Sequence, residues 1–260
     1  MPESKGHLNP GSDGVVFDRF ELGPGLGDLV RHVWVVRWDI PVGEVRPQRV
    51  LTYPAFNAVF TPGEATLFGP DSRLFVRELS GSSWAVGILF RPATAPLLTR
   101  TEPAALVGGG EALPHAPVAD VDLAMSEHGP GRGALARILR TWLLPLAGRV
   151  DARGRLVNDA CRIAEDDPSV LRAAELAARV GLSPRTLERA VRAHVGMTPK
   201  WLIECRRLQH AATTLFSVPE TDLTALALEL GYADYAHFSR QYKRVLGESP
   251  EQTRRAAEGA

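Results

Sequence analysis

The C-terminal third of the chain contains an internal repeat, which constrains the fold more than any other feature. Residues 176–182 (LAARVGL) are echoed by residues 226–232 (LALELGY) at an offset of 50, and Gly196 is matched by Gly247 at an offset of 51. Repetition at such an interval indicates one supersecondary unit that is used twice. The sequence therefore predicts two copies of a helical unit, joined by about one helix of chain.

Each copy has the spacing of a helix-turn-helix. Ala177 stands four residues before Gly181, and Ala227 stands four residues before Gly231, with apolar residues beside each of them. The small alanine lets the second helix cross the first closely. The glycine suits a turn that requires a positive φ, where a side chain would be strained. A repeated helical hairpin with no nucleic-acid role is the alternative interpretation.

The second helix of each copy has an apolar side and a polar side. Leu187 and Phe238 are placed to pack on the preceding helix, which leaves the opposite side free to enter a major groove. Arginine can bind guanine O6 and N7 with two N–H groups, and glutamate can accept from cytosine N4. The outward positions are Arg185, Glu188, Arg189 and Arg192, then Tyr235, His237, Arg240 and Gln241. Alternatively, such arginines are merely solvated or paired with carboxylates.

Residues from about 170 to 255 resemble the DNA-binding domain of AraC-type transcriptional regulators. The pattern runs through Leu176-Ala177, Gly181-Leu182-Ser183, Leu187, Arg189, residues 196–199 (GMTP), Trp201-Leu202, Arg207-Leu208, Ala211 and Leu215, and it is most specific over residues 226–250. The chain departs from it at Leu226 and Tyr232, where the family usually has Ile and Phe, and at Ala236, where it often has Ser. The resemblance implies DNA contacts by Arg185, Glu188, Arg189, Ala236, His237 and Arg240.

The segment between the two copies is predicted to be a single helix from Pro199 to about Leu215. At ~1.5 Å per residue such a helix is ~25 Å long, which is shorter than the ~34 Å of one turn of DNA. Both recognition helices would therefore reach successive major grooves only if the DNA bends or the helices splay.

The first half of the chain is predicted to be rich in β-strands. Runs of β-branched and aromatic residues are separated by Gly or Pro, with no ten-residue helical pattern between them, which favours an antiparallel barrel or sandwich over a parallel sheet. The runs are Leu29–Trp38, Val50–Thr61, Ala65–Phe68, Leu74–Leu79 and Trp84–Phe90. Gly108–Pro117 is expected to be a loop, and Gly133–Ala147 and Arg155–Glu165 are expected to be helical.

The predicted fold class is α+β. It comprises an N-terminal antiparallel β-barrel or cupin-like domain, a helical linker, and a C-terminal all-α domain of two helix-turn-helix units joined by a helix. We expect a disordered tail over 1–14, the β-rich domain over 15–120, the linker over 121–167 and the AraC-type domain over 168–255. Residues 168–260 carry 13 Lys and Arg against 10 Asp and Glu, whereas the whole chain carries 30 of each. This small excess of positive charge weakly favours nucleic-acid binding by the C-terminal end.

The β-rich part resembles the effector or oligomerisation half of the same regulator family. The resemblance rests on Val33-Trp34, Tyr53-Pro54, residues 67–70 (LFGP) and residues 87–92 (GILFRP). Aromatic side chains on the predicted strands could line a pocket for a small apolar or aromatic ligand. These candidates are Trp34, Trp38, Tyr53, Phe56, Phe60 and Phe90. The alternative is that they fill the interior of the barrel.

Other features of the sequence argue against further classes of protein. Cys161 and Cys205 lie in helical patterns, so buried thiols are expected rather than a disulfide framework. The seven histidines lack metal-ligand spacing, so no metal or other cofactor is expected. Nucleophile-elbow, Walker and dinucleotide motifs are lacking, which argues against an enzyme. Without a signal-like N-terminus or ~20 consecutive apolar residues, the protein is expected to be cytoplasmic.

Three hypotheses about function follow from these patterns. The leading one is a sequence-specific DNA-binding transcriptional regulator whose β domain senses a small molecule or dimerises. The second is an enzyme with a helical accessory domain, and the third is a DNA-binding protein whose β domain serves assembly alone. The expected partners are promoter or operator DNA, with RNA polymerase and a small-molecule effector as further candidates, and the chain would act as a monomer or homodimer.

Overall fold

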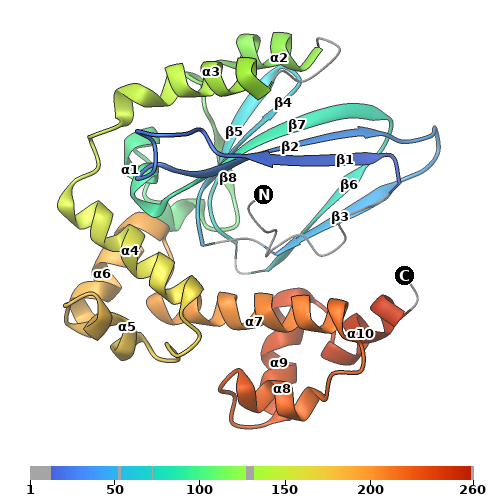
Figure 1. Ribbon diagram of the computed structural model, residues 1–260, viewed down its shortest axis with the longest axis vertical. Coiled ribbons are helices and arrows are strands. Elements are labelled where there is room, and N and C mark those ends of the chain that lie inside the picture. The colour runs from blue at the N-terminus through green and yellow to red at the C-terminus, as the bar shows by residue number, and fades with distance from the viewer. Residues whose placement is uncertain (1–12, 52–53, 72, 127–131, 259–260) are drawn as a thin grey trace.

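The computed structural model describes residues 13–51, 54–71, 73–126 and 132–258 (Figure 1). Residues 1–12 of the tail expected over 1–14 lie outside this range. The strands are β1 (Val15–Phe20), β2 (Val30–Asp39), β3 (Arg46–Leu51), β4 (Asn57–Thr61), β5 (Glu64–Phe68), β6 (Leu74–Leu79), β7 (Ser82–Phe90) and β8 (Gly110–Ala112). The helices before the C-terminal region are α1 (Ala95–Leu98), α2 (Val118–Ser126), α3 (Arg132–Leu143) and α4 (Ala152–Asp166), with 3₁₀ turns η1 (Pro92–Thr94), η2 (Pro103–Leu106) and η3 (Leu144–Leu146).

The C-terminal region consists of helices. They are α5 (Ala173–Arg179), α6 (Pro184–Val195), α7 (Pro199–Ser217), α8 (Leu223–Glu229), α9 (Tyr235–Leu246) and α10 (Pro250–Glu258). Within the described ranges, none of the helices is long and apolar enough to cross a bilayer.

The strands pair in two antiparallel sheets. Six strands form the larger sheet in the order β1-β2-β7-β4-β5-β8, and β3 pairs with β6 in a separate ribbon. These sheets and the helical region confirm the expected α+β class with an antiparallel N-terminal part. Among the strands described, β1 and β8 are the two edges of the larger sheet.

The structure contains two edge strands that the sequence patterns did not predict. β1 pairs with β2 from Val15 opposite Trp38 to Phe20 opposite Val33. β8 lies within 108–117, so the expectation of a loop over that whole segment is wrong. A Cβ atom at Gly110 would lie 2.9 Å from Cδ1 of Phe68, so the absence of a side chain allows this close pairing with β5.

The predicted run over residues 50–61 is also divided in the structure. β3 ends at Leu51 and β4 begins at Asn57, and the two strands belong to different sheets. An apolar run of that length cannot by itself show where the chain changes sheet.

The hydrophobic core of the β domain lies between the larger sheet and two helices. Val33 and Val35 point to the same face of β2 because side chains alternate along a strand, and both are buried. Val121 of α2 and Leu139 of α3 belong to the same buried cluster, and Figure 1 shows α2 and α3 above this sheet.

The helical region is organised around α7. Figure 1 shows α7 running below the β domain, with α5 and α6 near one end and α8 to α10 near the other. Leu202 and Ile203, in the first half of α7, are part of one buried cluster with α4, α5 and α6. Leu208 and Leu215, in its second half, belong to another cluster with α8 and α9. One helix therefore contributes to the cores of both repeated units.

The β domain contacts α4, which packs on the first repeated unit, and the end of α6. Asn158 of α4 is buried, and its side-chain oxygen accepts from the backbone N–H of Ala93 at 2.9 Å while its amide nitrogen donates to the carbonyl of Asp28 at 2.9 Å. Arg31 of β2 forms an ion pair with Glu165 of α4. Beyond the end of α6, a Cβ atom at Gly196 would lie 2.5 Å from the carbonyl oxygen of Pro103. Hydrogen bonds, an ion pair and close packing therefore all join the β domain to the helical region.

The two glycines that end α6 and α9 provide a matched test of this junction. Gly196 and Gly247 have left-handed φ values of 77° and 78°, so replacing either with Ala should cost ~1–2 kcal/mol of strain. The site at Gly247 has no neighbouring atom within 4 Å. We expect Gly196→Ala to lower the urea-unfolding free energy clearly more than Gly247→Ala. Equal losses would show that the Pro103 contact does not constrain the fold.

Candidate nucleic-acid interface

The first predicted helix-turn-helix is formed by α5 and α6. Ala177 is buried where the two helices meet, and Gly181 in the turn has a φ of +67°. Leu187 and Val191 are fully buried on one side of α6. The predicted roles of the alanine, the glycine and the apolar side are confirmed for this unit.

The second unit, formed by α8 and α9, has the same construction. Ala227, Phe238 and Tyr242 are fully buried, and Gly231 in the turn has a φ of +77°. α6 and α9 are both 12 residues long and both end at a left-handed glycine. The sequence repeat is therefore a repeat of structure.

The polar side of α6 is open to solvent. Arg185, Arg189 and Arg192 are exposed, and Glu188 is 42% exposed at its side chain. Nε of Arg192 donates to Oε1 of Glu188 at 2.9 Å, which is the expected i,i+4 pairing on a helix surface. A DNA base that accepted a hydrogen bond from Arg192, or donated one to Glu188, would compete with this weak surface ion pair.

The corresponding positions of α9 are less uniform. Ala236 and Arg240 are exposed. The ring of His237 is half-buried and lies edge-on to the ring of Tyr232, with centroids 5.3 Å apart. Tyr235 is half-buried and its hydroxyl donates to Glu251, so it is not a freely outward side chain as the pattern suggested. Gln241 is also half-buried, and its buried Oε1 atom accepts no hydrogen bond from the described part of the chain.

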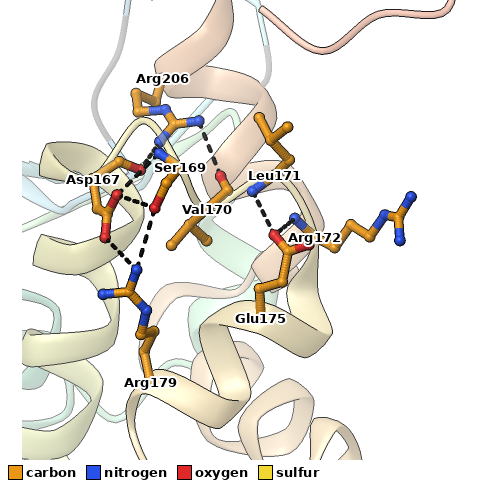
Figure 2. Close-up of polar contacts among 8 residues, drawn as sticks. All are labelled: Asp167, Ser169, Val170, Leu171, Arg172, Glu175, Arg179 and Arg206. Carbon is orange, nitrogen blue, oxygen red and sulfur yellow. Dashed lines mark hydrogen bonds and ion pairs between the residues drawn. The ribbon is translucent and has the colours of Figure 1, made fainter.

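Polar contacts attach the first unit to α7 (Figure 2). Arg206 of α7 donates to the backbone carbonyls of Asp167 and Val170, the latter at 3.0 Å. Nη2 of Arg179 lies 3.1 Å from Oδ2 of Asp167. The hydrogen bonds from Ser169 hold the pKa of Asp167 below its ordinary value. The segment before α5 is thus connected to both α5 and α7.

Glu175 stabilises the start of α5 by accepting hydrogen bonds from the backbone of the same segment. Its carboxylate accepts from the N–H groups of Leu171 at 2.8 Å and Arg172 at 3.0 Å, as Figure 2 shows. These bonds satisfy donors that a helix start leaves without partners, and they lower the pKa of Glu175.

The second unit is attached to α7 by a buried polar cluster that the sequence analysis did not single out. The hydroxyl of Tyr232 donates to Oε1 of Glu204 at 2.9 Å. The guanidinium of Arg207, which is nine-tenths buried, lies 3.7 Å above the Tyr232 ring and 3.4 Å from Oε2 of Glu204. Burial is the main cause of a raised pKa at Tyr232. Tyr232 was one signal in the sequence, because a tyrosine hydroxyl requires a partner when it is buried.

The six aromatic residues suggested for a ligand pocket do not share one site. Phe56, Phe60 and Phe90 are almost completely buried in the core of the β domain. Tyr53 lies outside the described residues. Trp34 and Trp38 are half-buried on the other face of β2 from Val33 and Val35.

Trp34 is itself closely packed on that face. Its ring stacks on Phe17, with centroids 6.4 Å apart and planes 13° apart. A Cβ atom at Gly87 would lie 1.9 Å from the Trp34 ring, so the glycine allows the ring to lie across β7. The indole N–H of Trp38 donates to the carbonyl of Ser80 at 3.1 Å.

His32 lies two residues before Trp34 on the same face of β2 and is 5% exposed. Burial and the nearby Arg19 and Arg31 lower its pKa from 6.5 to about 4. The imidazole is therefore neutral in the folded protein at pH 5, whereas the unfolded chain binds a proton there.

This difference predicts an acid-sensitive contribution to stability. Because the folded-state pKa is lowered, the contribution is fully present above pH 6.5 and is lost as the pH falls towards about 4. The loss should be of the order of 3 kcal/mol. Urea unfolding of wild type and His32→Gln should show a shallower pH dependence for the variant over this interval. Parallel profiles would contradict the buried, neutral imidazole.

Comparisons with known proteins agree with this geometry. Residues 176–256 match a family described as a helix-turn-helix domain, and residues 19–109 match a domain of unknown function (DUF6597). The transcriptional activator RhaS of Pectobacterium carotovorum is 34% identical over 82 residues, which are 32% of this chain and 29% of RhaS. RhaS of Yersinia pestis is 37% identical over 81 residues, 31% of this chain and 29% of that protein. The chain thus matches less than a third of the length of these relatives.

Two solved structures are similar to this chain, one over less than half of its length and the other over nearly all of it. The C-terminal domain of AraT, a response regulator from Geobacillus stearothermophilus, is 27% identical, with a TM-score of 0.37, over 41% of this chain and 88% of that one. ToxT from Vibrio cholerae is 11% identical, with a TM-score of 0.42, over 96% of this chain and all of that one.

The repeated fold and the sequence matches define a tandem helix-turn-helix protein. Residues 176–256 of this chain form an AraC-type helix-turn-helix domain.

Proposed function

We propose that the chain is a sequence-specific DNA-binding transcriptional regulator. The observation that carries the proposal is the pair of equivalent helices, α6 and α9, each packed by one side and each presenting an exposed arginine, Arg189 and Arg240, on the other. Surface arginines placed on recognition helices are suited to guanine edges in a major groove. The activator function of the RhaS relatives supports a role in transcription for this chain.

The two recognition helices would bind one duplex together. α7 has 19 residues, so at ~1.5 Å per residue it extends ~28 Å. This is still shorter than the ~34 Å between successive major grooves on one face. We therefore propose that binding of both helices bends the DNA or requires the recognition helices to splay.

The proposed base-contacting residues are those on the exposed sides of α6 and α9. Arg185, Arg189, Ala236 and Arg240 are accessible without rearrangement, whereas Tyr235 and Gln241 are partly engaged in packing. Glu188 and Arg192 would exchange their mutual ion pair for contacts to DNA, and His237 would use the edge that Tyr232 does not cover.

The β domain is proposed to control or assemble the DNA-binding half. A ligand-sensing role would use the face that carries Trp34 and His32, since the other face of β2 is filled by the hydrophobic core. A β domain that serves dimerisation alone is the alternative. A gel shift repeated with and without candidate small molecules distinguishes the two.

Loss of a recognition arginine should weaken specific binding while leaving the fold intact. Arg189→Ala and Arg240→Ala are each expected to cost on the order of 1–3 kcal/mol on a selected operator. Arg137→Ala, at an exposed position of α3 in the β domain, is the matched control and should have no effect. The measurement is fluorescence anisotropy on the sequence enriched from a random DNA pool. If both recognition variants bind as the control does, the proposed contacts are wrong.

DNA bending is tested separately on the same sequence. If the DNA bends and the helices do not splay, a circularly permuted set of fragments should show mobility that depends on the position of the site. Uniform mobility, together with footprints over both grooves, would contradict the bending model.

A further inference from the structure

A small cleft lies where the β domain meets α4. Its charged lining consists of Arg31 of β2, Arg91 directly after β7, and Arg162 and Glu165 of α4. The buried side chain of Asn158 is also part of the lining, and it fixes the cleft because it bonds to Ala93 and Asp28 of the β domain. The cleft is therefore built from both sides of the junction.

The lining has more positive than negative groups. Glu165 is the single carboxylate in it, and both of its oxygens accept from Arg31. Arg162 lies 3.4 Å from Asp159, and both side chains of that pair are more than half exposed. The guanidinium of Arg91 makes no hydrogen bond or ion pair with any residue that the structure describes.

Arg91 is half-buried but still reachable from solvent. Burial and the neighbouring charge of Arg31 lower its pKa, and this effect exceeds the opposing influence of Glu165 and Asp166. A guanidinium in such surroundings remains protonated and gains from a negative partner.

We propose that this cleft binds a small oxyanion, with Arg91 as its principal donor and Arg31 as the second. The shared chemistry is that of a phosphate or a carboxylate group, because the planar guanidinium donates two parallel N–H groups to either one. Such an anion would share Arg31 with Glu165 and would contact residues from the β domain and from α4 at once. Its binding does not depend on DNA.

The probes are inorganic phosphate and acetate, titrated into the full-length protein against sodium chloride of equal ionic strength. We expect at least one of the two to raise the thermal unfolding midpoint above the chloride series, and isothermal titration to give its affinity. A response to phosphate alone identifies a phosphate site, and a response to acetate alone identifies a carboxylate site. A midpoint that follows ionic strength alone for both probes overturns the proposal.

Variants separate the cleft from the rest of the surface. Arg91→Gln should weaken binding by about tenfold or more, because a charge-assisted hydrogen bond is lost. Arg137→Gln, which removes an exposed arginine of α3 outside the cleft, should bind as wild type does. Equal affinities of Arg91→Gln and wild type would refute the assignment.

Glu165→Gln should change the affinity for the anion in the opposite direction to Arg91→Gln. It removes the carboxylate that competes for Arg31, so the anion should bind more tightly than to wild type, even if the junction is less stable. Unchanged or weaker binding to the folded variant would count against the cleft. The affinity of Glu165→Gln therefore tests the proposal even if Arg91→Gln does not fold.

Discussion

The helix α7 buries side chains in two separate hydrophobic cores, and the placement of both helix-turn-helix units depends on this shared burial. Leu202 and Ile203 hold the first unit, and Leu208 and Leu215 hold the second. Each fully buried aliphatic side chain contributes ~1.5–3 kcal/mol, whereas an exposed ion pair such as that of Arg192 contributes ~0–1 kcal/mol. Apolar packing therefore sets the position of the recognition helices, and their polar sides remain available for another molecule.

Much of the helical half could be predicted because its determinants are local and occur twice. Glycine at the turn and alanine at the crossing impose the same backbone and packing requirements in both units, and Gly181 and Gly231 meet them with positive φ values of 67° and 77°. The β domain was less predictable, since strand pairing is non-local. β1 and β8 became strands by pairing with β2 and β5, and neither has a periodic apolar pattern strong enough to indicate this.

The same distinction applies to the candidate sites. The exposed arginines of α6 followed from helical periodicity, but the partly buried state of Tyr235 depends on Glu251, a residue of the next helix. Among the aromatic candidates, the sequence could not show that Phe60 lies against Trp142 of α3 in the core, with ring centroids 5.9 Å apart. The arginine cleft joins residues far apart in sequence, so only the folded chain shows it.

The unbroken course of α7 also determines how the protein can change during evolution. Each residue inserted into an α-helix advances the following chain by ~1.5 Å and turns it by about 100°. A single insertion between Ile203 and Leu208 would therefore rotate the second unit relative to the first, while Leu208 and Leu215 would stay in the core of the second unit. Lengthening by about whole turns preserves the phase. The separation of the two helices proposed to contact DNA, α6 and α9, can thus vary in coarse steps set by the helical pitch.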